Sequence, residues 1–92
     1  MIQSFACKDT ASLYVTGKSR RFAALISVAT RKLQMLTAAH ALEDLNSPPG
    51  NRLEALRGKR SGQHSMRIND QWRLCFEWRD GHAWNVEIVD YH

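Results

Sequence analysis

Six basic side chains lie between Arg52 and Arg73, a window that holds only two acids: Arg52, Arg57, Lys59, Arg60, Arg67 and Arg73. The rest of the chain carries seven residues of each sign, so the formal net charge of +4 equals the surplus of this window. The sequence ends on Asp90, Tyr91 and His92, and the last two carry rings that exchange protons. Such groups beside a basic surface suit chemistry on a polyanion, so RNA or DNA is the first partner to consider.

Cleavage of RNA without a metal needs a base for the 2′-hydroxyl proton, an acid for the leaving 5′-oxygen and cations at the phosphoryl oxygens. Arginine suits the last task, because it binds phosphate through two N–H groups and stays charged. Arg57, Arg67 and Arg73 are therefore the candidates for a phosphate site.

Three residues are candidates for the proton transfers. An unperturbed histidine such as His92 titrates near neutrality. Tyr91 needs flanking cations that lower its pKa before it serves as a base; otherwise it stacks on a nucleobase or orients the substrate. Glu54 is an alternative base. Non-catalytic interpretations also remain open: His92 can be part of a frayed tail, and Tyr91 can be a half-buried ring that only supports the structure.

The composition indicates a single folded domain over residues 1–92, with 43% hydrophobic and 24% charged residues. Cys7 and Cys75 match no zinc pattern, and we expect unpaired thiols in a reducing compartment. The first residues lack a secretion signal, and no apolar run approaches the ~20 residues that cross a bilayer. We therefore expect a soluble cytoplasmic protein.

Apolar spacing predicts helices in the first half of the chain. Residues 2–5 suit a short strand, and Ser19 is placed to cap a helix over Arg20–Ala38. A second short helix over Ala38–Leu45 is plausible, before the two prolines of residues 46–50 break the chain.

The second half changes to the alternation of strands, with turns at 69–71 and at Asp80-Gly81. The expected strands are 53–56, 63–68, 72–78 and 83–89. Helices followed by an antiparallel meander predict an α+β fold, with two N-terminal helices on one face of a small, mainly antiparallel β-sheet.

Alternation also assigns the faces of the sheet. Trp72, Leu74, Phe76 and Trp78 point to the core, together with Trp84, Val86 and Ile88. Arg67, Arg73 and Tyr91 then share a solvent-facing concave surface, with Lys59 and Arg60 in the basic loop at its rim. Spacing alone supports a nucleic-acid-binding α+β domain.

The segment 51–76 contains Leu53-Glu-Ala-Leu-Arg-Gly58 and Arg67-Ile-Asn-Asp-Gln-Trp-Arg73, and Val89-Asp-Tyr-His92 follows later. Together with the length and the opening residues 1–5, these elements resemble the HigB-type toxins of the RelE/ParE superfamily, from bacterial toxin–antitoxin pairs. The resemblance covers essentially the whole chain, and its specificity comes from the combination of motifs.

The resemblance implies a RelE-like fold and an endoribonuclease that cuts mRNA in the A site of the 70S ribosome, without metal or cofactor. It implies a cognate HigA-like helix-turn-helix antitoxin, with operator DNA bound only through the antitoxin complex, and no membrane. By position, Arg73 would bind the scissile phosphate, Tyr91 would transfer a proton or orient the substrate, and Asp90 and His92 would complete the site.

The chain departs from some members of this family at two positions. They carry a His and a Lys where this chain has Glu54 and Arg57, which removes candidate acids and predicts weaker or slower cleavage.

Two alternative functions remain open: a non-enzymatic toxin that inhibits DNA gyrase, as ParE-type relatives do, and a passive RNA-binding module.

Overall fold

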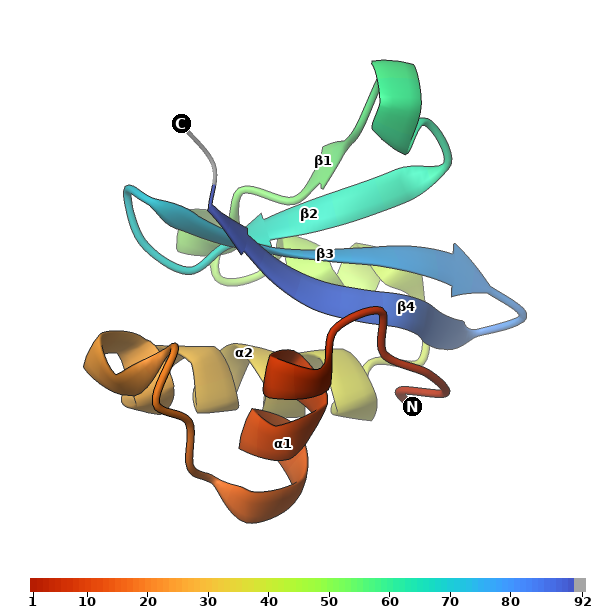
Figure 1. The fold of residues 1–92 in the computed structure, drawn as a ribbon. Coiled ribbons are helices and arrows are strands. Elements are labelled where there is room, and N and C mark those ends of the chain that lie inside the picture. Colours follow the sequence, from red (N-terminus) through yellow and green to blue (C-terminus); the bar gives the residue numbers. More distant parts are fainter. Residues whose placement is uncertain (91–92) are drawn as a thin grey trace.

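An antiparallel sheet lies over two helices in the computed structural model, which describes residues 1–90 (Figure 1). The helices are α1 (Lys8–Thr16) and α2 (Ile26–Ala38). The strands are β1 (Glu54–Ala55), β2 (Gln63–Arg67), β3 (Trp72–Arg79) and β4 (His82–Asp90), in the order β1-β2-β3-β4. Both helices cover the same face of the sheet (Figure 1), so the predicted α+β architecture is confirmed.

The opening residues run parallel to β4 along its free edge. Ile2 and Phe5 form isolated parallel bridges to Ala83 and Val86. The predicted strand 2–5 is therefore reduced to two bridges, but it ties the N-terminus to the last strand.

The prediction for the helices was partly wrong. The helix expected from Arg20 begins only at Ile26, after a 3₁₀ turn over Ala23–Leu25. Ser19 Oγ accepts a hydrogen bond from the Phe22 amide at 3.1 Å, so Ser19 caps the turn that precedes α2. The helix expected over Ala38–Leu45 is absent, because the chain is extended at Ala39 and forms a 3₁₀ helix over Leu42–Asn46.

Helix α1 was not predicted, because its sequence is mostly polar. Its buried residues are Thr10 and Leu13. Gly17 ends the helix in the left-handed region at φ 74°, and its amide donates to the Leu13 carbonyl at 2.8 Å. The Ile88 amide of β4 donates to Thr10 Oγ1 at 3.1 Å, so a tertiary hydrogen bond fixes this helix to the sheet.

The core lies between the helices and the sheet. Its fully buried members include Leu13, Phe22, Ala29, Leu33, Leu36, Met66, Leu74, Phe76 and Val86. The apolar spacing that predicted a helix here therefore corresponds to a face of α2 that packs on the sheet, through the buried Ala29, Leu33 and Leu36 and the half-buried Ile26.

A bulge changes the face of one tryptophan. The Asp80-Gly81 turn joins β3 and β4 as predicted, but the register slips between Cys75 and Glu77. The extra residue lies on β4, where Asn85 has a positive φ of 52°. Because one inserted residue inverts the alternation, Trp84 pairs with Glu77 and lies on the face away from the helices. Its predicted place in the core was wrong.

Two threonines test how α1 is held. Thr10→Val should lower the free energy of unfolding by about 1–3 kcal/mol, because it leaves the buried Ile88 amide without an acceptor. Thr30→Val is the matched control, because the buried Thr30 Oγ1 has no hydrogen-bond partner among the described residues. Urea unfolding of both variants measures the difference; equal losses would contradict this role of Thr10.

Candidate functional site

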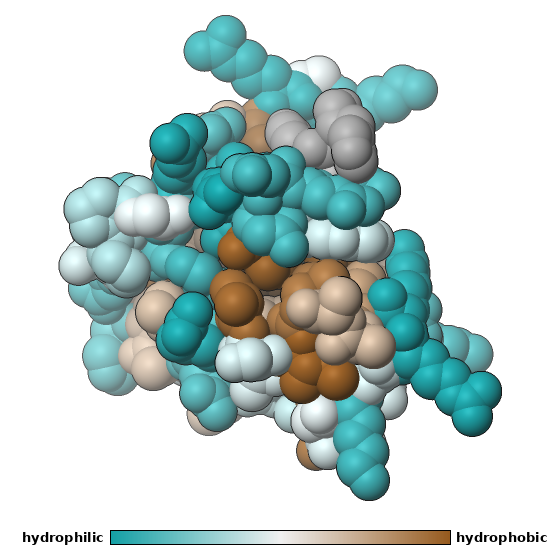
Figure 2. All heavy atoms as spheres, turned by 90° about the vertical axis from the view of Figure 1, so that its left-hand side faces the viewer, coloured by the Kyte–Doolittle hydropathy of each residue, from teal (hydrophilic) through white to brown (hydrophobic). Residues whose placement is uncertain are grey.

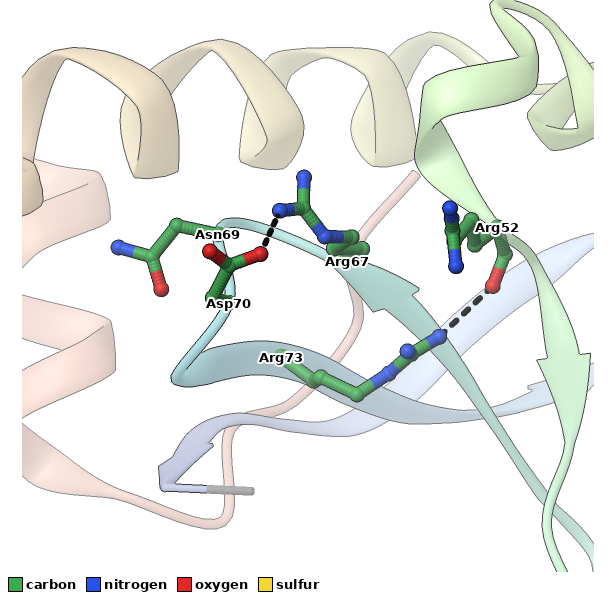
Figure 3. A pocket seen from close by; sticks show the side chains of 5 residues that line it. All are labelled: Arg52, Arg67, Asn69, Asp70 and Arg73. Carbon is green, nitrogen blue, oxygen red and sulfur yellow. Dashed lines mark hydrogen bonds and ion pairs between the residues drawn. The ribbon is translucent and has the colours of Figure 1, made fainter. Parts of the chain in front are cut away.

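Three arginines line a pocket at one end of the sheet. Its lining residues are Arg52, Arg67, Asn69, Asp70 and Arg73, and its volume is about 230 Å³. Arg67 and Arg73 are cross-strand partners on β2 and β3, so their side chains leave the same face of the sheet. Arg52 comes from the loop before β1, and Asn69 and Asp70 come from the β2–β3 turn (Figure 3). We call this pocket the arginine cleft.

Arg73 is the most restrained of the three arginines. Arg73 is only 9% exposed, although the alternation of the strand predicted that its side chain would lie on a solvent-facing surface. The guanidinium donates from Nε to Ser65 Oγ at 2.8 Å and from Nη2 to the Arg52 carbonyl at 2.7 Å. The ion pair with Glu54 measures 3.5 Å from Nη2 to Oε1. These contacts join β3, β2, β1 and the preceding loop at one side chain.

The turn at Arg52 brings a backbone carbonyl into the cleft. Arg52 has a left-handed φ of 45°, and its amide donates to the Pro49 carbonyl at 3.1 Å. Asn51, fully buried, donates through Nδ2 to the carbonyls of Leu45 and Ser47 at 3.2 and 3.3 Å. This buried amide therefore fixes the loop that presents Arg52 to Arg73.

The β2–β3 turn supplies the acidic wall of the cleft. Arg67 pairs with Asp70 (Figure 3), and the Asp70 side chain is almost fully exposed. Asn69 Oδ1 accepts hydrogen bonds from the amides of Gln71 and Trp72, both at 2.8 Å, and so shapes the turn. An incoming phosphate would compete with Asp70 for the guanidinium of Arg67, because both are anionic acceptors.

The structure brings together some of the residues predicted for the site. Arg67 and Arg73 line the cleft, and Glu54 reaches it through its ion pair with Arg73. Arg57 and Lys59 are exposed and do not line it. Arg60 is also outside, because its Nη1 donates to Gln63 Oε1 at 3.0 Å and to Glu87 Oε1 at 2.8 Å.

Asp90 lies on the other side of the sheet from Arg73. It is the cross-strand partner of Trp72, whose ring packs against the core, and its Oδ2 accepts from Gln71 Nε2 at 3.1 Å. The alternation of β3 therefore separates the Asp90 side chain from the arginine face. Tyr91 and His92 lie outside the described residues, so their predicted roles stay predictions.

Sequence reasoning missed three lining residues: Arg52, Asn69 and Asp70. Arg52 belongs to the basic window and Asn69 to the motif segment from Arg67 to Arg73, so signals for both were present, whereas Asp70, an acid in the same segment, did not suggest a phosphate site. Their convergence depends on the left-handed turn at Arg52 and the Asn69 turn, neither of which follows from alternation.

The face that carries the cleft is less open than expected. The Cys75 thiol is fully buried on this face, near the ion pair of Arg60 and Glu87. Burial raises the pKa of Cys75, so its thiol stays protonated near neutrality. Cys7 and Cys75 are both unpaired.

The surface around one end of the molecule combines polar and apolar regions. Figure 2 shows hydrophilic side chains over much of this side and an apolar patch among them.

Within residues 1–90, no three His, Cys, Asp or Glu side chains gather as a metal site. None of the helices in the described part of the chain is long and apolar enough to span a membrane.

The fold and the cleft define a small α+β protein with a basic cleft at one end of its sheet. The sequence profile of the HigB-like toxins, described as RelE-like toxins of the type II toxin–antitoxin system HigB, matches residues 3–92. The chain belongs to this family.

Two curated relatives match the chain over part of their length. Toxin HigB-1 of Vibrio cholerae is 52% identical over 58 residues, which cover 63% of this chain and 61% of that protein. A protein of Haemophilus influenzae is 39% identical over 64 residues, which cover 70% of this chain and 63% of its own length. The match thus spans about three fifths of both relatives.

Two further comparisons cover the whole chain. Endoribonuclease HigB of Proteus vulgaris is 29% identical over 93 residues and is covered completely. A solved structure of the YoeB-YefM complex from Staphylococcus aureus contains a chain with a TM-score of 0.57 and 19% identity, covering 100% of this chain and 98% of that one. The structural likeness supports the fold.

The hydroxyl of Ser65 provides a test of how Arg73 is anchored. Ser65→Ala should lower the free energy of unfolding by about 2 kcal/mol, because it removes the buried acceptor of a charged donor. Ser61→Ala, on an exposed serine of the neighbouring loop, should change it by less than about 0.5 kcal/mol. Urea unfolding compares the two, and an equal effect would show that this hydrogen bond does not stabilise the fold.

Proposed function

We propose that this chain is a type II toxin that inhibits translation as a ribosome-dependent endoribonuclease and cleaves mRNA without a metal. The observation that carries the proposal is the arginine cleft, where three guanidinium-bearing residues converge beside the carboxylate of Glu54. Two comparisons support the same activity: the chain belongs to the HigB-like toxins, and one of its relatives is named Endoribonuclease HigB.

Arg73 suits the phosphate of the bond that breaks. Its guanidinium is held in place before substrate arrives, so little reorganisation is needed when negative charge builds on the phosphoryl oxygens. Arg67 and Arg52 add charge at the same cleft. Arginine cannot donate a proton near neutrality, so these residues stabilise charge and other groups transfer protons.

Glu54 is the proposed base of the reaction. Its carboxylate lies 3.5 Å from Arg73 Nη2, close to where a phosphate on Arg73 would lie. It would take the proton of the 2′-hydroxyl, whose oxygen then attacks phosphorus and forms a cyclic phosphate. The 5′-oxygen leaves with a proton from an acid, for which Tyr91 and His92 are the candidates.

The proposed partners follow from the same function. The ribosome would present mRNA and supply part of the substrate positioning, so a modest set of protein groups suffices. A cognate helix-turn-helix antitoxin of the HigA type would neutralise the toxin and carry the complex to operator DNA. This function places the protein in the cytoplasm.

Mapping the cut ends of a defined mRNA tests the proposal. Purified protein with programmed ribosomes should produce cuts at A-site codons, and Arg67→Ala should reduce them by roughly tenfold or more, because charge stabilisation is lost. Arg67 is partly exposed, so its truncation should leave the fold intact. Arg20→Ala, which removes an exposed cation before α2, is the matched control and should cut normally.

Three outcomes would contradict the proposal. Cuts that do not need ribosomes would indicate a free ribonuclease. Equal cutting by Arg67→Ala and wild type would move the site away from the cleft. No cuts, with growth arrest in cells that express the chain, would favour a non-enzymatic inhibitor of DNA gyrase.

A further inference from the structure

Lys32 is a buried cation that the proposed mechanism does not use. It lies on α2 and is only 8% exposed, whereas the other described lysines are exposed. Its Nζ donates a hydrogen bond to Asn51 Oδ1, and within residues 1–90 no carboxylate forms an ion pair with it. A buried ammonium without an acid is unfavourable for folding, so the structure retains an uncompensated charge at this position.

Asn51 connects this charge to the arginine cleft. Its side chain accepts from Lys32 through Oδ1 and donates through Nδ2 to the carbonyls of Leu45 and Ser47. The next residue, Arg52, lines the cleft and accepts from Arg73 Nη2 through its carbonyl at 2.7 Å. A continuous set of contacts therefore runs from the ammonium on α2 to the guanidinium on β3.

Two cations and one neutral amide act on the Lys32 ammonium. Burial lowers the pKa of Lys32, and the charges of Arg31 on its own helix and of Arg67 on β2 lower it further. Asn51, from the loop, is neutral. An anion bound in the cleft beside Arg67 would offset this repulsion and so favour the charged form of Lys32.

We propose that Lys32 is a positioning residue of the arginine cleft, whose charged ammonium holds Asn51 and the Arg52 turn in place and strengthens the binding of an RNA phosphate. This inference rests on the proposed function. It gives α2, which supplies no lining residue, a part in substrate binding.

The proposal makes RNA affinity depend on pH. The contribution of Lys32 is present while its ammonium is charged, and it disappears as the pH rises through its lowered pKa. The arginines of the cleft stay charged over the same range. An alkaline loss of affinity that depends on residue 32 therefore reports on this lysine.

The experiment measures binding of a short adenylate RNA with 2′-O-methyl riboses, which block cleavage, from about pH 7 to about pH 10. Fluorescence anisotropy gives the dissociation constant for wild type, Lys32→Met and Lys18→Met. The affinity of wild type for the RNA should fall roughly tenfold from the lower to the higher pH. The affinity of Lys32→Met should already be lower than that of wild type by a similar factor at neutral pH, and it should change little as the pH rises. Lys18→Met, on an exposed lysine after α1, should behave like wild type.

A second variant keeps the test decisive if Lys32→Met unfolds, which thermal melts at each pH would reveal. Asn51→Asp places a carboxylate beside Lys32, so it should raise the pKa of Lys32, shift the alkaline loss to higher pH and weaken binding at neutral pH. An unchanged profile in either folded variant would overturn the inference. Arg67→Ala, measured in the same assay at neutral pH, separates the two proposals: if it binds RNA as tightly as wild type, the cleft is not the phosphate site and the proposed function is overturned instead.

Discussion

The guanidinium of Arg73 is the contact on which the cleft depends. Removing this charged group from water is costly, and its hydrogen bonds to Ser65 and to the Arg52 carbonyl compensate that cost. The same bonds fix the loop before β1 against β2 and β3. A residue suited to phosphate therefore also organises the fold around the place where phosphate would bind, which couples the stability of this end of the sheet to its function.

The positive charge of the arginine cleft comes from how a few side chains are arranged, more than from the net charge of a segment of the chain. Residues 8–32 hold six cations and one acid, a larger surplus than that of the basic window, yet most of these cations are exposed on the helical layer. At the cleft, Arg73 is buried and Arg67 is half-buried, and charge acts more strongly where it is removed from water, whereas Arg52 stays exposed. Glu54 and Asp70 offset only part of this charge.

The sequence predicted most strands and the core face of α2, because alternation and apolar spacing follow directly from burial. It failed where long-range contacts decide the structure. Helix α1 depends on the hydrogen bond between Thr10 and β4, and the side of Trp84 depends on the bulge at Asn85. Arg73 was predicted for the site from motif and alternation, but its partner at the Arg52 carbonyl depends on a loop conformation that periodicity does not encode.

The central claim is that the arginine cleft is where RNA phosphate binds. The most direct test is NMR of the arginine Nε–H groups during titration with an uncleavable 2′-O-methyl RNA. The account predicts that the signals of Arg67 and Arg73 shift on binding, while that of the exposed Arg20 stays in place. Shifts confined to arginines of the helical layer, with Arg67 and Arg73 unchanged, would contradict it.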